Sequence, residues 1–164
     1  MDKHTRKDLL GTQMGFNQMR NSIYWLQRYM KKNNHPNEEI DSRLFDMGSN
    51  MGDSYYLTKK NDYHSLSDLI KSLYKDIFHS NIEIKKINGN KILVKDSKCA
   101  LCKYQYDDIS VPGCTIETGM ISSLLKHYGF SVSDSHVLKS KALGNDGCLH
   151  EYELLENTGG SKDE

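Results

Sequence analysis

Residues 111–128 read VPGCTIETGMISSLLKHY, and the rest of the chain is organised around this segment. Pro112 and Gly113 interrupt whatever precedes them and Gly129 follows, so the pattern predicts a helix of about fifteen residues between these breaks. Apolar side chains recur at helical spacing and form one broad stripe: Ile116, Met120, Ile121, Leu124 and Leu125. Small residues keep the remaining surface thin: Gly113, Gly119, Ser122 and Ser123. We therefore expect a central helix with neighbours on more than one side and with Cys114 in its first turn.

The composition is that of a single domain with no net charge. The chain has 164 residues and a formal net charge of zero, so we expect one domain over residues 1–156 and a disordered tail over residues 157–164. Lys and Arg are spread along the chain, and no nucleic-acid surface is predicted. No apolar run approaches the roughly twenty residues of a membrane span, and the N-terminus lacks the apolar segment of a signal peptide. We therefore expect a cytoplasmic protein without a membrane span.

Hydrophobic periodicity predicts the other elements. Helical spacing indicates three helices before residue 80, over residues 5–33, over 38–60, and from a cap at Ser65 or Ser67 to Ile77. Alternation of apolar and polar residues indicates two hairpins. The first has strands on either side of Asn88-Gly89, and the second has strands over 131–143 and 148–155 joined by the turn 144–147. In the second helix Gly48 and Gly52 predict close packing against the central helix. The order predicts an α+β domain, in which a helical layer packs on one face of a twisted antiparallel sheet.

The four cysteines carry the clearest chemistry. Cys99 and Cys102 form a Cys-x-x-Cys pair, Cys114 follows in the central helix, and Cys148 begins the last strand. In a reducing cytoplasm such residues are thiols or metal ligands rather than disulfides. The spacing suits a tetrahedral structural zinc ion (Zn²⁺), with His150 as a substitute ligand. Plain buried thiols and a thioredoxin-like redox pair remain alternatives, and no water-activating carboxylate at a recognisable spacing indicates a catalytic zinc.

Three motifs in this order resemble the 4-vinyl reductase domain family, whose archaeal members are described as hydrocarbon-binding proteins. They are the Cys-x-x-Cys pair, the segment over residues 111–125, and GNDGCLHEYEL over residues 144–154. The segment LFDMGSNMG, residues 44–52, is similar to the equivalent helix of the small TRAPP vesicle-tethering subunits. The resemblance implies one shared fold, with helices on one side of a twisted antiparallel sheet, that is commonly dimeric through the helical layer.

The resemblance also implies a ligand set. In the sensor branch of the family, zinc is held by a cysteine matching Cys114, a cysteine matching Cys148, and a Glu and a Cys on the intervening strand. This chain departs from that pattern, because the positions near Val137 and Ser140 offer neither a carboxylate nor a thiol. The resemblance therefore implies that Cys114 and Cys148 lie side by side and that the Cys-x-x-Cys pair completes the zinc site.

The resemblance implies binding rather than catalysis. Our leading hypothesis is a non-enzymatic domain that binds or senses an apolar small molecule, with Met120 and Leu124 lining the pocket. An ordinary filled core is the alternative for these two residues. Glu117, the one acid in the central helix, is expected to cap or pair locally. No glycine-rich dinucleotide loop supports a reductase enzyme.

The alternative function is a TRAPP-type interaction scaffold. It would be a homodimer or a paralogous heterodimer joined through the helical layer, with no need for metal or ligand. Some TRAPP subunits carry an acylated cysteine just before the third helix. Residues 59–64 of this chain contain no cysteine, so a covalent lipid is excluded at that place.

Overall fold

The computed structural model of the chain describes residues 15–60, 62–87 and 90–155. Within these ranges the chain forms α2 (Phe16–Lys32), α3 (Asn37–Thr58), α4 (Leu66–Phe78), β1 (Glu83–Ile87), β2 (Lys91–Asp96), α5 (Thr115–His127), β3 (Val132–Lys139), the short 3-10 helix η1 (Lys141–Leu143) and β4 (Cys148–Leu154). The first part of the predicted first helix, the turn at Asn88-Gly89 and the predicted tail lie outside the described residues.

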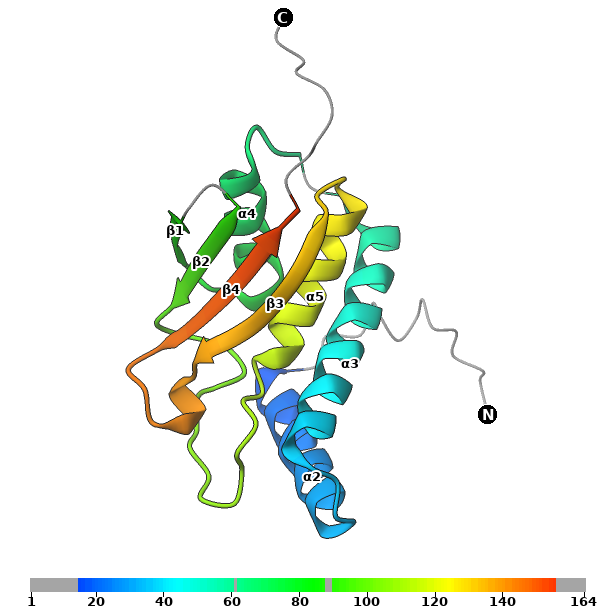
Figure 1. Cartoon of the computed structure of the whole chain (residues 1–164), viewed down its shortest axis with the longest axis vertical. Coiled ribbons are helices and arrows are strands. Elements are labelled where there is room, and N and C mark those ends of the chain that lie inside the picture. Colours follow the sequence, from blue (N-terminus) through cyan, green and yellow to red (C-terminus); the bar gives the residue numbers. More distant parts are fainter. Residues whose placement is uncertain (1–14, 61, 88–89, 156–164) are drawn as a thin grey trace, which may run out of the picture.

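The four strands form one antiparallel sheet in the order β1-β2-β4-β3. The last strand therefore lies between β2 and β3. In Figure 1, α4 and α5 lie behind the sheet, and α3 lies beyond α5. Helices α4 and α5 pack on the inner face, where β2 and β4 contribute a row of buried side chains: Ile92, Val94, Cys148, His150 and Tyr152. The predicted α+β architecture, with a helical layer on one face of an antiparallel sheet, is confirmed.

The segment over residues 111–128 forms the central helix, as predicted. Every residue of α5 from Thr115 to Leu125 is buried, between the sheet on one side and α3 on the other. The helix stops because Gly129 adopts a left-handed conformation, with φ of 89°, and the Phe130 N–H donates back to the Leu125 carbonyl at 3.0 Å. The predicted stop at this glycine is therefore confirmed.

Glycines allow α3 and α5 to approach until their backbones touch. A Cβ atom built on Gly48 would lie 2.1 Å from the Ile116 carbonyl oxygen, and one built on Gly119 would lie 2.2 Å from the Phe45 carbonyl oxygen. Both distances are far inside van der Waals contact, so no other residue fits at either position without separating the helices. The close packing predicted from the small residues is confirmed.

One predicted strand boundary is wrong. The strand expected over residues 131–143 ends at Lys139, and Lys141–Leu143 form the short helix η1. The Ser140 hydroxyl caps η1 by accepting a hydrogen bond from the Ala142 N–H at 3.2 Å. Gly144, with φ of 90°, ends it. Local capping by a serine side chain thus outweighs the strand preference of this segment.

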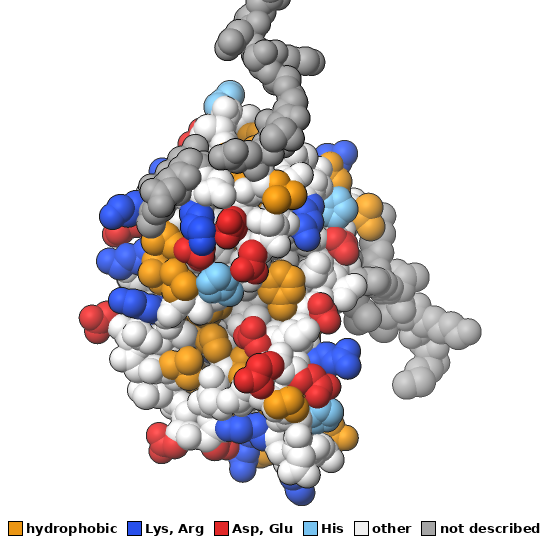
Figure 2. Space-filling model, viewed as in Figure 1, with side chains coloured by type: hydrophobic (Ala, Val, Ile, Leu, Met, Phe, Trp, Pro, Cys, Tyr) orange, Lys and Arg blue, Asp and Glu red, His pale blue; other side chains and the backbone are white. Residues whose placement is uncertain are grey.

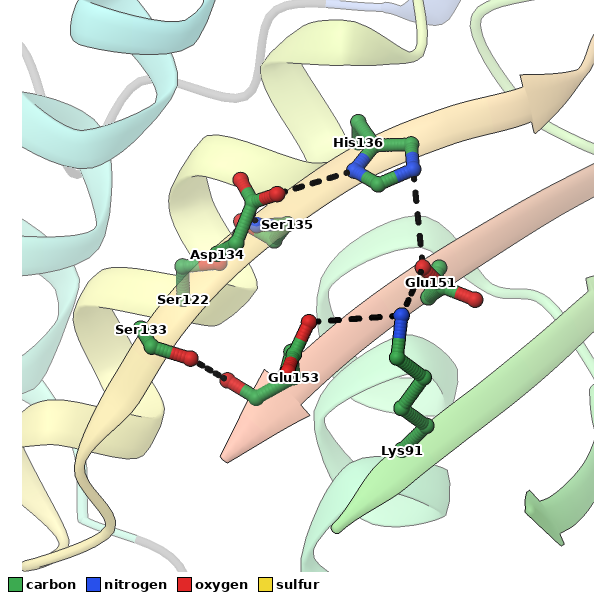
Figure 3. A network of polar contacts seen from close by, with 8 residues as sticks. All are labelled: Lys91, Ser122, Ser133, Asp134, Ser135, His136, Glu151 and Glu153. Carbon is green, nitrogen blue, oxygen red and sulfur yellow. Dashed lines mark hydrogen bonds and ion pairs between the residues drawn. The ribbon is translucent and has the colours of Figure 1, made fainter. Parts of the chain in front are cut away.

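The outer face of the sheet is polar. Figure 2 shows positive and negative side chains interspersed on this side of the molecule. Figure 3 shows their cross-strand network: Lys91 Nζ lies 3.2 Å from Glu151 Oε1 and 3.3 Å from Glu153 Oε2, while His136 Nε2 lies 3.5 Å from Glu151 Oε1. Hydrogen bonding to Glu151 raises the pKa of the Lys91 ammonium group. Opposite charges on neighbouring strands stabilise the pairing of β2, β4 and β3.

No described helix is both long enough and apolar enough to cross a membrane.

Candidate metal centre

The four cysteines meet at one place in the core. Cys99 and Cys102 lie in the loop after β2, Cys114 is the residue before α5, and Cys148 is the first residue of β4. Their Sγ atoms all lie within 4.8 Å of one another, and all four side chains are buried. The expected proximity of Cys114 and Cys148 is confirmed. We call these four residues the cysteine clamp.

The spacing of the cysteine clamp fits a tetrahedral metal ion. With zinc–sulfur bonds of about 2.3 Å, the sulfurs of a zinc tetrathiolate lie about 3.8 Å apart, which is inside the observed limit. All four cysteines are free thiols, so each Sγ is available as a donor. The surroundings offer hydrogen bonds to the sulfurs, since the Ser140 hydroxyl donates to Cys102 Sγ and the Lys141 N–H donates to Cys148 Sγ, both at 3.4 Å. The donor set therefore matches the structural zinc expected from the sequence.

The thiols of the cysteine clamp shift one another's pKa values through hydrogen bonds. Hydrogen bonds from Cys102, Cys114 and Cys99 hold the pKa of the Cys148 thiol far below its ordinary value. Hydrogen bonding to the other three sulfurs raises the pKa of Cys99, and burial is the main reason why the pKa of Cys114 is also raised. A bound cation would take the place of the protons on these thiols, because thiols bind metal ions as thiolates.

Two buried carboxyl groups lie beside the cysteine clamp. The Cys99 thiol donates to Glu117 Oε1 at 3.2 Å, so the expectation that Glu117 pairs locally is wrong. Burial raises the pKa of the Glu117 carboxyl group well above its usual range. Asp96, the last residue of β2, accepts a hydrogen bond from the Lys98 N–H at 2.9 Å. Sequence reasoning did not single out Asp96, although its position three residues before Cys99 was a usable signal.

A second buried polar group links α4 to β4. The Tyr74 hydroxyl oxygen lies 2.6 Å from His150 Nδ1 and 2.7 Å from the Tyr152 hydroxyl oxygen. Burial raises the pKa of both tyrosines well above the usual range, so both hydroxyl groups stay protonated. His150, the substitute ligand expected from the sequence, shares the inner face of β4 with Cys148, but it hydrogen-bonds to Tyr74 and does not belong to the four-sulfur group.

Replacing Tyr74 by phenylalanine is expected to lower the free energy of unfolding by about 1–3 kcal/mol, because it leaves His150 and Tyr152 buried without their shared partner. Chemical denaturation monitored by circular dichroism measures the change. Tyr63→Phe is the control, since the Tyr63 hydroxyl makes only a 3.3 Å bond to the Tyr128 carbonyl at the surface. Equal stability of the two variants would contradict a structural role for the buried network.

The predicted pocket residues lie in the packed core. Met120 and Leu124 are buried in the hydrophobic cluster between α4, α5 and the sheet. Four hollows on the described part of the chain, with volumes from about 20 to about 420 Å³, are lined by other residues. The smallest of these, between α2 and the loop over residues 101–113, has room for about one water molecule. The lining role of Met120 and Leu124 stays a prediction.

Comparison with known proteins finds similar structures but no similar sequences. No protein-family model matches the chain, and no curated protein matches its sequence. The fold is similar to the crystal structure of a trafficking protein particle complex subunit 3 from Naegleria fowleri covalently bound to palmitic acid, with a TM-score of 0.67 and 17% identity over 86% of this chain and 95% of that one.

A second similar structure is an H-NOX protein from S. oneidensis in the Fe(II)NO ligation state. Its TM-score is 0.56, with 13% identity over 88% of this chain and 78% of that one. At such low identity the likeness concerns the fold and does not single out the 4-vinyl reductase domain family. The chain therefore shares the fold of a small trafficking protein particle subunit, with a cysteine clamp at the start of its central helix.

Proposed function

We propose that this chain is a non-enzymatic binding domain whose framework is held by a structural zinc ion at the cysteine clamp. The observation that carries the proposal is the mutual proximity of four buried sulfurs from three separate segments. Zinc bound by four thiolates has no open coordination position, so it would supply a cross-link between α5, β4 and the loop after β2 rather than a reactive water. Such a cross-link fixes the central helix against the sheet.

The proposed ligand is an apolar small molecule that binds against α5, beside Met120 and Leu124. Support comes from the shared fold, since the two similar structures are described with palmitic acid and with an Fe(II)NO group. Binding in this chain would be non-covalent, because all four cysteines belong to the cysteine clamp. The core around Met120 is filled by side chains, so the ligand would enter the core by displacing them. Methionine suits this role because its unbranched side chain repacks easily.

A second candidate function is a dimeric interaction scaffold, and the surface of α2 favours it. Trp25, Leu26 and Tyr29 are 57%, 38% and 66% exposed, and helical spacing places them on one side of α2. Arg28 lies over the Trp25 ring at 5.0 Å. Aromatic residues and arginine are enriched at protein interfaces. As a scaffold, the protein would form a homodimer or a paralogous heterodimer in which α2 provides the contact through the helical layer.

Native mass spectrometry of the gently purified protein tests both candidates. Ligand binding predicts an apolar adduct that denaturing solvent removes, and added palmitate is expected to raise the melting temperature. The scaffold predicts a dimer without adduct, which Trp25→Ala converts to monomer while Leu57→Ala, at another exposed apolar residue, leaves it intact. An empty monomer that palmitate does not stabilise would contradict both.

A further inference from the structure

Next to the cysteine clamp, one thiol and two carboxyl groups form a second donor group. One ligand atom from each of Asp96, Cys99 and Glu117 lies within 4.8 Å of the others. All three side chains are buried, and they come from the end of β2, the loop that follows it and the first turn of α5. The loop after β2 and the start of α5 also contribute to the cysteine clamp, so the two groups share Cys99 and lie side by side.

Among the residues that the structure describes, each carboxyl group has one oxygen without a partner. Asp96 Oδ2 and Glu117 Oε2 are fully buried and accept no hydrogen bond from these residues, whereas their other oxygens accept from the Lys98 N–H and the Cys99 thiol. The ion pairs of the described part of the chain involve other acidic residues. Buried carboxylates in proteins are normally paired with a cation or coordinate a metal, because an uncompensated buried charge is costly.

We propose that Asp96, Glu117 and Cys99 bind a second divalent transition-metal ion, with the Cys99 sulfur bridging it to the zinc of the cysteine clamp. This inference rests on the proposed function, since the bridging thiolate requires an occupied clamp. Two carboxylate oxygens and one thiolate form a mixed donor set that suits Zn²⁺ and disfavours Mg²⁺ or Ca²⁺, which take oxygen ligands.

Electrostatics favours a second ion once the clamp is filled. A zinc ion with four thiolates keeps a net negative charge, and two ionised carboxyl groups beside it would add repulsion among buried side chains. A second cation between the thiolate and the carboxylates removes that repulsion and satisfies both free oxygens. The competing arrangement keeps both carboxyl groups protonated and needs no second metal. The two arrangements differ in how many ions bind and in the effect of neutral replacements.

The test is the zinc content of the full chain. Protein saturated with Zn²⁺ and freed of unbound metal by desalting is expected to hold about two ions per chain by plasma mass spectrometry. Glu117→Gln and Asp96→Asn, which keep side-chain shape but remove the charge, are each expected to hold about one, with all four thiols still protected from a thiol reagent. Glu153→Gln, on the outer face of the sheet, is the control and is expected to hold the wild-type number.

The outcomes separate the two claims. One ion per wild-type chain with protected thiols overturns the second site and leaves the clamp standing. No bound zinc and four reactive thiols overturn both. Two ions that persist in Glu117→Gln and Asp96→Asn place the second ion elsewhere and also overturn the inference. If a variant does not fold, the wild-type ratio still decides between one site and two. Unchanged melting temperatures of both variants in saturating zinc would favour protonated carboxyl groups and count against the second ion.

Discussion

Cys114→Ser is expected to abolish zinc binding by the cysteine clamp and to lower the free energy of unfolding by at least about 3 kcal/mol. Structural zinc sites contribute on the order of 10 kcal/mol of apparent binding free energy, and this energy is available only to the folded state. Cys114 directly precedes α5, the helix that contacts both the sheet and α3. The ion would therefore link this helix to β4 and to the loop after β2. Loss of the ion would therefore destabilise the centre of the fold rather than its edge.

Metal analysis, thiol titration and thermal melting of the purified variant check this expectation together. Ser140→Ala is the matched control, since it removes a hydroxyl group that donates to Cys102 Sγ but leaves all four sulfurs in place. It is expected to retain zinc and to lose only about 1 kcal/mol. Wild-type protein that contains no zinc, exposes four reactive thiols and melts at the same temperature as Cys114→Ser would show that the clamp is a set of plain buried thiols.

Gly119→Ala is expected to destabilise the domain by about 3 kcal/mol or more. In an ordinary helix the change would stabilise by about 1 kcal/mol, because alanine has the higher helix propensity. Here the new Cβ would lie 2.2 Å from the Phe45 carbonyl oxygen, which is backbone and cannot rotate away. The helices α3 and α5 would have to separate, and the packing between them would be lost along their length.

Gly48→Ala tests the same contact from the opposite helix, since its Cβ would meet the Ile116 carbonyl oxygen at 2.1 Å. Gly113→Ala is the control, because its nearest neighbour, the Leu101 carbonyl oxygen, lies at an ordinary 3.4 Å. Urea denaturation of the three variants gives the ranking. A change in midpoint for Gly119→Ala or Gly48→Ala no larger than for Gly113→Ala would show that the two helices do not touch through their backbones.

Much of the fold was predictable because its signals are local. The helix breaks at Gly113 and Gly129, the apolar stripe of α5 and the glycines of α3 each reflect the conformation or packing of a few neighbouring residues. The strand predicted beyond Lys139 was wrong for an equally local reason, since the Ser140 side chain caps η1 in competition with strand pairing. Local competition of this kind leaves no trace in hydrophobic periodicity.

The candidate site was predictable only in part. Cysteine spacing and family resemblance were enough to nominate all four sulfurs, because metal-binding thiols occur in recognisable pairs. Asp96 and the partners of Glu117 and His150 were not predictable in this way. Aspartate, glutamate and histidine occur throughout protein surfaces. Only full burial, with one polar atom of each side chain lacking a partner among the described residues, distinguishes these three from the rest.

By itself, the sequence determined the helices and strands other than the end of β3 and η1, the central position of α5 and the identity of the four thiols, since these depend on spacing along the chain. The tertiary structure alone decided that β4 lies between β2 and β3, and this placement puts His150 next to Tyr74. Strand order depends on how whole faces of the sheet and helices are buried against one another. This burial involves many contacts between residues far apart in the sequence, so no local sequence pattern predicts it.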